Sequence, residues 1–165
     1  MIKNGLFTGS FDPVTNGHVD LIKRGANLFD KLYVGIFYNK NKQGFFTIEE
    51  RKRMLERTLK DIPNVQVITA QNSLAVDIAR RLEVNYLLRG LRNVADLDYE
   101  TNLAFYNGHL ATEIETVLFL SSPELSQVSS SRVRELIHFH ADISSFVPAP
   151  VLEEVEKKCD NFTTI

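Results

Sequence analysis

The sequence contains a single cysteine, Cys159, among its 165 residues. One thiol can form neither an intrachain disulfide nor a cysteine-rich metal site, so both features are excluded. Cys159 lies far along the chain from the polar motifs described below, and we interpret it as a packing or surface residue. Histidines outside those motifs lack the spacing of metal ligands, so we expect ordinary helix residues at His109, His138 and His140.

Long apolar runs and an excess of one charge are also missing. No segment approaches the roughly 20 consecutive apolar residues of a membrane span, and none has the form of a secretory signal. We therefore expect a cytoplasmic protein with no membrane partner. The formal net charge of −2 and the pI of about 6.1 disfavour a surface for nucleic-acid duplexes, which requires a basic patch. Local basic groups could still bind a small phosphorylated ligand.

Internal repeats, low-complexity tracts and domain linkers are absent too, so residues 1–165 are predicted to form one domain. Segments rich in β-forming residues alternate with helical patterns. The predicted strands cover residues 5–7, 31–38, 65–68, 86–88 and 116–120. The predicted helices cover residues 19–29, 47–59, 74–82, 96–111, 130–139 and 150–158. This alternation predicts an α/β fold, a single Rossmann-like domain with a mostly parallel sheet and helices on both faces.

Two of these helices have clear signals in the sequence. Thr47 followed three residues later by Glu50 has the form of a capping box and predicts a helix start. The helix at 19–29 shows apolar residues at spacings of three and four, which form one face: Val19, Ile22, Ala26 and Phe29.

The first strand leads into the most informative stretch of the chain, Phe7-Thr8-Gly9-Ser10-Phe11-Asp12-Pro13-Val14-Thr15-Asn16-Gly17-His18. It brings a hydroxyl from Ser10 and an imidazole from His18 to the N-terminus of a helix, where free N–H groups and the helix dipole favour phosphate. We interpret Gly9 and Gly17 as small hinge residues, and Gly17 as leaving room for a phosphate to approach the backbone. The Gly-x-Gly-x-x-Gly fingerprint and the Walker pattern are missing, which counts against NAD, FAD and a P-loop.

Polar side chains also follow other predicted strands. Lys42 lies in the loop at 39–44, and Arg89 and Arg92 flank a glycine after the fourth strand. The segment after the fifth strand holds three serines at a predicted helix start, followed by Arg132 and Arg134. Because ligands of parallel α/β sheets bind outside the carboxyl ends of the strands, we expect these groups to line one rim. Arginines and a serine-rich helix start suit a triphosphate.

Each of these features also has a purely structural explanation. His18 could be only a helix-start residue, the loop of Lys42 a solvated surface loop, and one of the three serines an N-cap. Asp12 could cap or brace the turn rather than contact a ligand. The convergence of four strand ends favours a ligand site over these separate explanations.

The same residues resemble a known family. Thr15-Asn16-Gly17-His18 is similar to the Thr/His-x-Gly-His core of the nucleotidyltransferase superfamily, and Val128-Ser129-Ser130-Ser131-Arg132-Val133-Arg134 resembles its second element, a Ser/Thr-rich helix start followed by a basic residue. The block Arg89-Gly90-Leu91-Arg92-Asn93-Val94-Ala95-Asp96-Leu97-Asp98-Tyr99-Glu100 resembles the one typical of bacterial phosphopantetheine adenylyltransferases. The resemblance runs in order over nearly the whole chain.

This resemblance implies adenylyl transfer from ATP to 4′-phosphopantetheine, giving dephospho-coenzyme A and pyrophosphate, the penultimate step of coenzyme A biosynthesis. It implies in-line attack without a covalent enzyme intermediate, with catalytic roles for Ser10, His18, Lys42 and Arg92. The positions that correspond to ATP contacts are Ser10, Phe11, Gly17, His18, Gly90, Leu91, Arg92, Glu100, Leu125, Ser126, Gln127, Val128, Ser129, Ser130 and Ser131. The positions that correspond to acceptor contacts are Ser10, Lys42, Ala75 and Arg89.

The resemblance also implies partners other than the two substrates. Mg²⁺ is expected with ATP, held by phosphate oxygens and water, because the sequence shows no dedicated carboxylate cage. A homohexamer is expected because family members are commonly hexameric. Coenzyme A stays open as a feedback ligand.

Two positions depart from the family pattern. Ser10 stands where many relatives have threonine, and it keeps the hydroxyl group. Leu125 stands where many relatives have an aromatic side chain, which puts a stacking contact with the nucleotide in doubt.

Other functions stay open at this point. A sibling nucleotidyltransferase acting on nicotinamide mononucleotide or glycerol phosphate would share the His18 motif but is not expected to carry the block at 89–100 with the Lys42 loop. A non-catalytic nucleotide-binding module should have lost His18, Lys42 or Arg92. A purely structural interaction protein has no reason to gather such groups on one rim.

Overall fold

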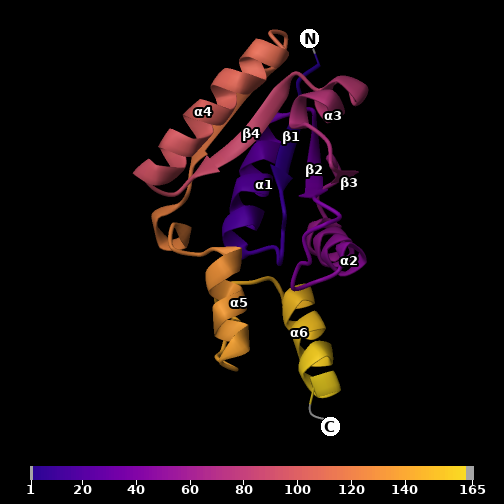
Figure 1. Cartoon of the computed structure of the whole chain (residues 1–165), viewed down its shortest axis with the longest axis vertical. Coiled ribbons are helices and arrows are strands. Elements are labelled where there is room, and N and C mark those ends of the chain that lie inside the picture. Colours follow the sequence, from indigo (N-terminus) through magenta and orange to yellow (C-terminus); the bar gives the residue numbers. More distant parts are fainter. Residues whose placement is uncertain (1, 163–165) are drawn as a thin grey trace.

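The computed structural model of the chain describes residues 2–162, except for the side chains of 160–162. Within this part, five strands form one sheet in the order β3-β2-β1-β4-β5, and every neighbouring pair is parallel (Figure 1). The strands are β1 (Asn4–Gly9), β2 (Lys31–Tyr38), β3 (Val65–Gln71), β4 (Tyr86–Leu91) and β5 (Glu115–Leu120). The predicted α/β fold with a parallel sheet is confirmed.

Helices connect successive strands, and two more follow β5. They are α1 (Asn16–Leu28), α2 (Ile48–Leu59), α3 (Ala75–Arg81), α4 (Val94–Leu110), the 3₁₀ turn η1 (Pro123–Leu125), α5 (Ser130–His138) and α6 (Ala149–Phe162). The six predicted helices are all present, whereas η1 was not predicted. Between residues 2 and 162, no helix combines the length and apolar character that a membrane span needs.

Two element boundaries differ from the predictions in ways that affect the site. β4 continues to Leu91 because residues 89–91 pair with Leu118, Phe119 and Leu120 of β5. Arg89 therefore lies within the strand rather than after it. α4 begins two residues earlier than predicted, because the side chain of Asn93 accepts the backbone N–H of Asp96 at 2.9 Å and caps the helix.

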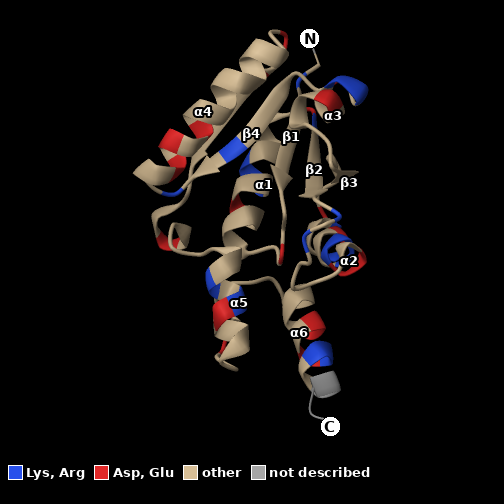
Figure 2. Ribbon diagram, viewed as in Figure 1, with Lys and Arg blue, Asp and Glu red and all other residues tan. Residues whose placement is uncertain are grey.

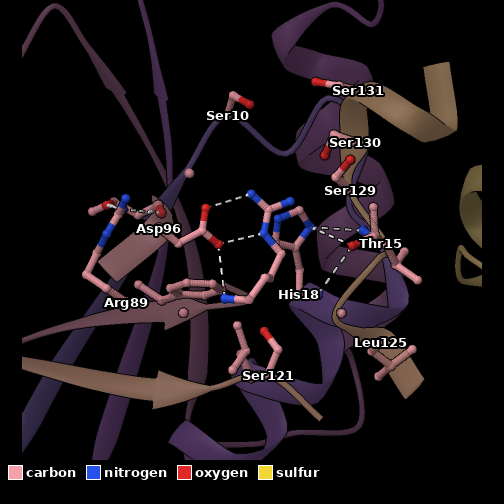
Figure 3. A pocket seen from close by; sticks show the side chains of 18 of the residues that line it. Ser10, Thr15, His18, Arg89, Asp96, Ser121, Leu125, Ser129, Ser130 and Ser131 are labelled. Atoms are coloured by element: carbon pink, nitrogen blue, oxygen red, sulfur yellow. Dashed lines mark hydrogen bonds and ion pairs between the residues drawn. The ribbon is translucent and has the colours of Figure 1, made fainter. Parts of the chain in front are cut away.

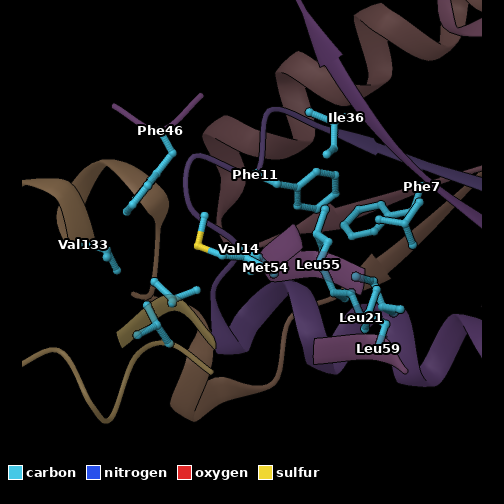
Figure 4. Close-up of a cluster of buried hydrophobic side chains, with 14 of the residues drawn as sticks. Phe7, Phe11, Val14, Leu21, Ile36, Phe46, Met54, Leu55, Leu59 and Val133 are labelled. Atoms are coloured by element: carbon cyan, nitrogen blue, oxygen red, sulfur yellow. The ribbon is translucent and has the colours of Figure 1, made fainter. Parts of the chain in front are cut away.

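Each face of the sheet is covered by its own apolar cluster, because successive strand residues point to opposite faces. In β1, Phe7 packs in the larger cluster with residues of α1, α2, α5 and α6, and several of these side chains are seen together in Figure 4. Its neighbour Leu6 packs in the other cluster, with Val76 and Ala79 of α3. The predicted placement of helices on both faces is thus confirmed.

The strand order places a ligand crevice at the centre of the sheet. From β1 the chain builds outward through β2 and β3, and it then returns to the other side of β1 to build β4 and β5. Connections from the neighbouring strands β1 and β4 therefore lead to opposite sides, and a crevice opens beyond their carboxyl ends.

Candidate active site

A cavity of about 380 Å³ lies beyond the carboxyl ends of β1 and β4 (Figure 3). Its walls come from β1, the following turn, the starts of α1 and α5, β4 and α4. The predicted site residues that line it are Ser10, Gly17, His18, Arg89, Gly90, Arg92, Glu100, Leu125, Val128, Ser129, Ser130 and Ser131. Chain segments more than 100 residues apart in sequence thus meet at one rim, as the strand-end argument predicted.

His18 sits in the first turn of α1 with one ring nitrogen already occupied. Its Nδ1 accepts the backbone N–H of Thr15 at 3.0 Å, and the Thr15 side chain accepts the backbone N–H of His18 in return. His18 therefore fills the position that Glu or Gln holds in an ordinary capping box. Because Nδ1 is an acceptor, the neutral ring carries its proton on Nε2, which is left as a hydrogen-bond donor.

The surroundings of His18 keep the ring neutral. Burial away from water, and to a smaller extent the positive charge of Arg92, lower the pKa of His18 to about 4. The ring of Phe11 packs edge-on against the imidazole at 5.0 Å between centroids, and the Phe11 side chain is buried. Phe11 thus supports His18 from the core, and its ring is not part of the cavity lining.

The turn between β1 and α1 is not shaped by its glycines. No glycine in the described chain has a positive φ, whereas Phe11 adopts a φ of 45°. Gly9 ends β1 and Gly17 lies in the first turn of α1, and their interpretation as hinges stays a prediction. A Cβ atom on Gly17 would meet the carbonyl oxygen of Leu125 at 3.6 Å, an ordinary contact, so its missing side chain serves chiefly to leave the cavity open.

Arg89 is held rigidly by a buried carboxylate. Two guanidinium nitrogens, Nε and Nη2, donate to the two carboxylate oxygens of Glu100 at 2.7 and 2.6 Å, and Nη1 donates to Thr8. The Glu100 side chain is only 7% exposed, so its charge is balanced within the protein by Arg89. The two residues form one wall of the cavity.

Arg92 is also paired, with a residue that sequence reasoning had not assigned a role. Its Nε and Nη2 donate to Asp96 at 2.9 and 3.1 Å, and its backbone N–H donates to the same carboxylate at 3.0 Å. These bonds hold the pKa of the Asp96 carboxyl below its ordinary value. Arg92 precedes the N-cap Asn93, so the pair joins the end of β4 to the first turn of α4 and does not follow the pairing rule for residues within a helix.

The start of α5 brings its serines to the cavity, and each hydroxyl makes one hydrogen bond within the protein. Ser129 caps the helix by accepting the backbone N–H of Arg132, as expected for one of the three. Ser130 donates to the carbonyl oxygen of Pro13 at 2.7 Å, and Ser131 accepts from Arg134 at 3.2 Å. Ser130 uses its O–H group in this way, whereas Ser129 and Ser131 act only as acceptors and keep their O–H donors, which add to the backbone N–H groups and the dipole of this helix start.

The two arginines after the serines have different environments. Arg134 lines the cavity and donates to the backbone oxygen of Asp12 at 2.5 Å. Arg132 instead pairs with Glu135 at 2.6 Å with a side chain that is 74% exposed, and it is not in the cavity lining. We expected both arginines to lie where a triphosphate could bind. Only Arg134 lies at the cavity.

Lys42 lies at a second cavity, of about 470 Å³, beyond the carboxyl ends of β2 and β3. The lining of this second cavity is Phe37, Tyr38, Asn39, Lys42, Ala70, Asn72, Ser73 and Leu74. Ala75 starts α3 directly after Leu74 and lies just outside this lining. Because all strands are parallel, the two cavities open at the same edge of the sheet.

The remaining predicted contacts are not in the lining of either cavity. Leu91 is buried in the fold, and Ser126 and Gln127 lie between η1 and α5. Residues that sequence reasoning did not assign but that line the first cavity include Thr15, Asp96, Tyr99 and Ser121. In the described part of the chain, no cluster of three or more His, Cys, Asp or Glu side chains could hold a metal ion.

Comparisons with known proteins agree with this geometry. Residues 6–136 match the family model of the cytidylyltransferase-like proteins. A relative from Streptococcus mutans, named phosphopantetheine adenylyltransferase, is 61% identical over 157 residues, which cover 95% of this chain and 95% of the relative. A protein of the same name from Streptococcus gordonii is 58% identical over 156 residues, covering 94% of this chain and 95% of the relative.

A solved structure gives independent support for the fold. A chain from Vibrio parahaemolyticus, described as a nicotinate-nucleotide adenylyltransferase, matches with a TM-score of 0.69 over 94% of this chain and 91% of its own length. At 15% identity this likeness shows the fold alone. The family model and the relatives at 58% and 61% identity lead to one conclusion: the chain belongs to the phosphopantetheine adenylyltransferase family of cytidylyltransferase-like proteins.

Proposed function

We propose that this chain transfers the adenylyl group of ATP to 4′-phosphopantetheine, giving dephospho-coenzyme A and pyrophosphate. The observation that carries the proposal is the match to relatives of that name over 95% of the chain, at 61% identity. The geometry supports it, because the cavity at β1 and β4 combines a neutral imidazole, three arginines and a helix N-terminus. These are groups that bind and stabilise a polyphosphate.

In this reaction an oxygen of the acceptor phosphate forms a bond to the α-phosphorus of ATP, and the bond from that phosphorus to the bridging oxygen of pyrophosphate breaks. The electron pair of the broken bond leaves with pyrophosphate. No protein nucleophile is needed, because the acceptor phosphate is itself a nucleophile near neutral pH. The contribution of the chain is therefore to position the two phosphates and to stabilise charge that moves toward the leaving group.

His18 is the residue proposed to act on the α-phosphate. Its neutral ring presents an Nε2–H group, and a donor of this kind stabilises the oxygens of the α-phosphate as charge develops in the transition state. Because Thr15 fixes the ring through Nδ1, little reorganisation is needed during the reaction.

The β- and γ-phosphates are proposed to lie against Arg92 and the start of α5. Arg92 is pre-oriented by Asp96, and the N–H groups of the α5 start face the cavity that also contains His18. Gly90, Glu100, Leu125 and Val128 complete the proposed nucleotide wall, whereas Phe11 and Leu91 contribute through packing. Ser126 and Gln127 stay predicted ATP contacts.

The acceptor is proposed to lie across both cavities. Ser10 and Lys42 would hold its phosphate and relieve the repulsion between that phosphate and ATP, and the pantetheine arm would occupy the cavity near Ala75. Arg89 is the further residue proposed to contact the acceptor.

Mg²⁺ is proposed to arrive with ATP as part of the substrate. The two carboxylates of the cavity, Asp96 and Glu100, are both ion-paired with arginines. Phosphate oxygens and water therefore supply the ligands that Mg²⁺ prefers, an arrangement common at nucleotide sites. The cytoplasmic location and coenzyme A as a feedback ligand stay predictions.

Self-association is proposed to proceed through α4. This helix buries only Glu100 among its 17 residues and contains no Lys or Arg (Figure 2). Its exposed large apolar residues are Val94, Leu97, Tyr99, Phe105, Tyr106 and Leu110. An apolar surface of this kind marks an interaction site, and the homohexamer implied by the family resemblance would cover it.

The direct test of the proposed function is pyrophosphate release from ATP and Mg²⁺ with three acceptors assayed in parallel: 4′-phosphopantetheine, nicotinamide mononucleotide and glycerol 3-phosphate. We expect release with 4′-phosphopantetheine only. Release only with another acceptor would keep the proposed His18 chemistry but overturn the assignment of the acceptor. No release from folded protein would instead favour a non-catalytic nucleotide-binding module.

A further inference from the structure

Asp12 lies beneath the site with both carboxylate oxygens engaged. Oδ1 accepts the backbone N–H of Phe46 at 2.8 Å, and Oδ2 accepts that of Phe45 at 2.9 Å. Nε of Arg51 lies 3.2 Å from Oδ1, and the side chains of Asp12 and Arg51 are 10% and 6% exposed, respectively. The carboxylate thus connects the turn after β1 to the end of the loop that carries Lys42 and to α2.

Arg51 extends this connection in two directions. Its Nε donates to the carbonyl oxygen of Phe46 at 2.9 Å, and its Nη1 donates to the carbonyl oxygen of Ser10 at 3.2 Å. From the opposite side, Arg134 of α5 donates to the backbone oxygen of Asp12. One buried ion pair therefore contacts the backbone of Ser10, the Lys42 loop and, through Asp12, Arg134 of α5.

The Lys42 loop depends on this pair for its position. Residues 39–45 are exposed, and within the described chain their one hydrogen bond outside the loop runs from Phe45 to Asp12. Gly44 lies directly against the pair, because a Cβ atom there would stand 1.5 Å from Nη2 of Arg51 and 3.0 Å from Oδ2 of Asp12. The loop backbone is thus seated on the ion pair two residues after Lys42.

We propose that the Asp12–Arg51 pair is a positioning device that holds Lys42 and Ser10 in register, so that both groups bind the acceptor phosphate together. Neither Asp12 nor Arg51 lines a cavity, so both act through other residues. The proposal rests on the proposed function, because it concerns the phosphate of the acceptor. A buried ion pair is weak evidence for stability, but here it fixes the positions of the backbone segments that it contacts. Those positions matter because a displacement of about 1 Å at a reacting group can cost about 100-fold in rate.

Asp12→Asn tests the pair with the least change in volume. The amide keeps one acceptor oxygen, but it removes the charge facing Arg51 and the second acceptor for the loop. We expect kcat/KM for 4′-phosphopantetheine to fall by about 10- to 100-fold, while KM for ATP changes less than about 2-fold. Arg57→Gln is the matched control, because it removes an exposed pair with Glu153 from the same helix and should leave both parameters unchanged.

A double-mutant cycle with Lys42→Ala separates positioning from simple loss of structure. If Asp12 acts partly through Lys42, then adding Asp12→Asn to Lys42→Ala should cost clearly less in kcat/KM than Asp12→Asn costs alone, and the remaining loss acts through Ser10. Losses that multiply in full, or equal losses for ATP and the acceptor, would overturn the proposal.

Gly44→Ala keeps both charges of the pair and tests the same contact if Asp12→Asn does not fold. Its methyl group forces Arg51 away from the loop, so the same selective loss for 4′-phosphopantetheine and the same non-additivity with Lys42→Ala are expected. Unchanged kinetics in folded Gly44→Ala would overturn the proposal. Failure of the proposed function itself would be distinguishable, because the unaltered protein would then not adenylylate 4′-phosphopantetheine at all.

Discussion

At the scale of single residues, His18 is poised as a donor because two separate features keep it neutral and oriented. Thr15 occupies Nδ1 through its backbone N–H, which leaves the proton on Nε2. Burial, with a smaller effect from Arg92, disfavours a second proton on the ring. A histidine in this setting donates to phosphate without first having to gain or lose a proton.

The lowered pKa gives a prediction that needs no substrate. In the folded protein the ring should stay neutral down to about pH 4, whereas in the unfolded chain it takes up a proton near pH 6.5. The unfolded state thus binds more protons between these values. The contribution of His18 to the free energy of unfolding is therefore fully present above pH 6.5 and is lost as pH falls toward 4.

NMR titration of the imidazole ring measures this pKa directly. The His18 signal can be assigned by its loss in His18→Gln, and the three other histidines of the chain serve as internal references. A midpoint near pH 4 is expected for His18. A midpoint close to 6.5 would show that the ring is solvated and would remove the basis for a neutral donor.

At the scale of helices and strands, local signals were enough to predict where most elements begin. The Thr47–Glu50 capping box is present as predicted, with Thr47 Oγ1 accepting from Glu50 at 3.2 Å and Glu50 accepting from the Thr47 N–H at 2.7 Å. The end of β4 was not predictable in the same way, because the apolar run is interrupted by Arg89 and Gly90. They become a strand through pairing with β5, a contact distant in sequence.

The same distinction between local and distant contacts explains which parts of the site could be predicted from the sequence. The residue types at the strand ends were visible in the motifs. The contact of Asp12 with Arg51 joins residues 39 positions apart, and only the completed fold brings them together. The separation of Lys42 and His18 into two cavities likewise depends on the strand order, which places β2 and β3 on one side of β1 and β4 on the other.

The capping box of α2 supports a prediction about stability. Thr47→Ala removes the side-chain acceptor for the Glu50 N–H at an exposed position, so the free energy of unfolding should fall by about 1 kcal/mol. Thr47→Ser keeps the acceptor and should lie close to the unaltered protein. Urea denaturation of the three proteins measures the difference, and equal stability of Thr47→Ala and Thr47→Ser would contradict the capping role.

At the scale of the whole molecule, α4 is the feature that a single chain leaves unexplained. Phe105 and Tyr106 are 70% and 63% exposed on a helix whose surface has few charges (Figure 2). Water contact with so many large apolar groups is unfavourable, and association through α4 would remove it.

Light scattering should therefore give a solution mass that is a multiple of the 18.8-kDa chain, about six-fold if the homohexamer is correct. Phe105→Asp places a charge in the proposed interface and should lower the mass toward that of one chain. Phe139→Asp is the control, because Phe139 is equally exposed, at 71%, but lies at the end of α5. A mass of one chain for the unaltered protein would show that α4 is not an assembly surface.

The central claim is that the chain forms dephospho-coenzyme A and that His18 stabilises the transition state of that reaction. The most direct measurement is the rate at which dephospho-coenzyme A, identified by mass, appears from saturating ATP, Mg²⁺ and 4′-phosphopantetheine, with and without His18→Ala. We predict product and pyrophosphate in equal amounts, and a loss of about 100- to 1,000-fold in kcat for the variant with little change in ATP binding. No product from folded protein, or equal kcat values in the two proteins, would contradict the account.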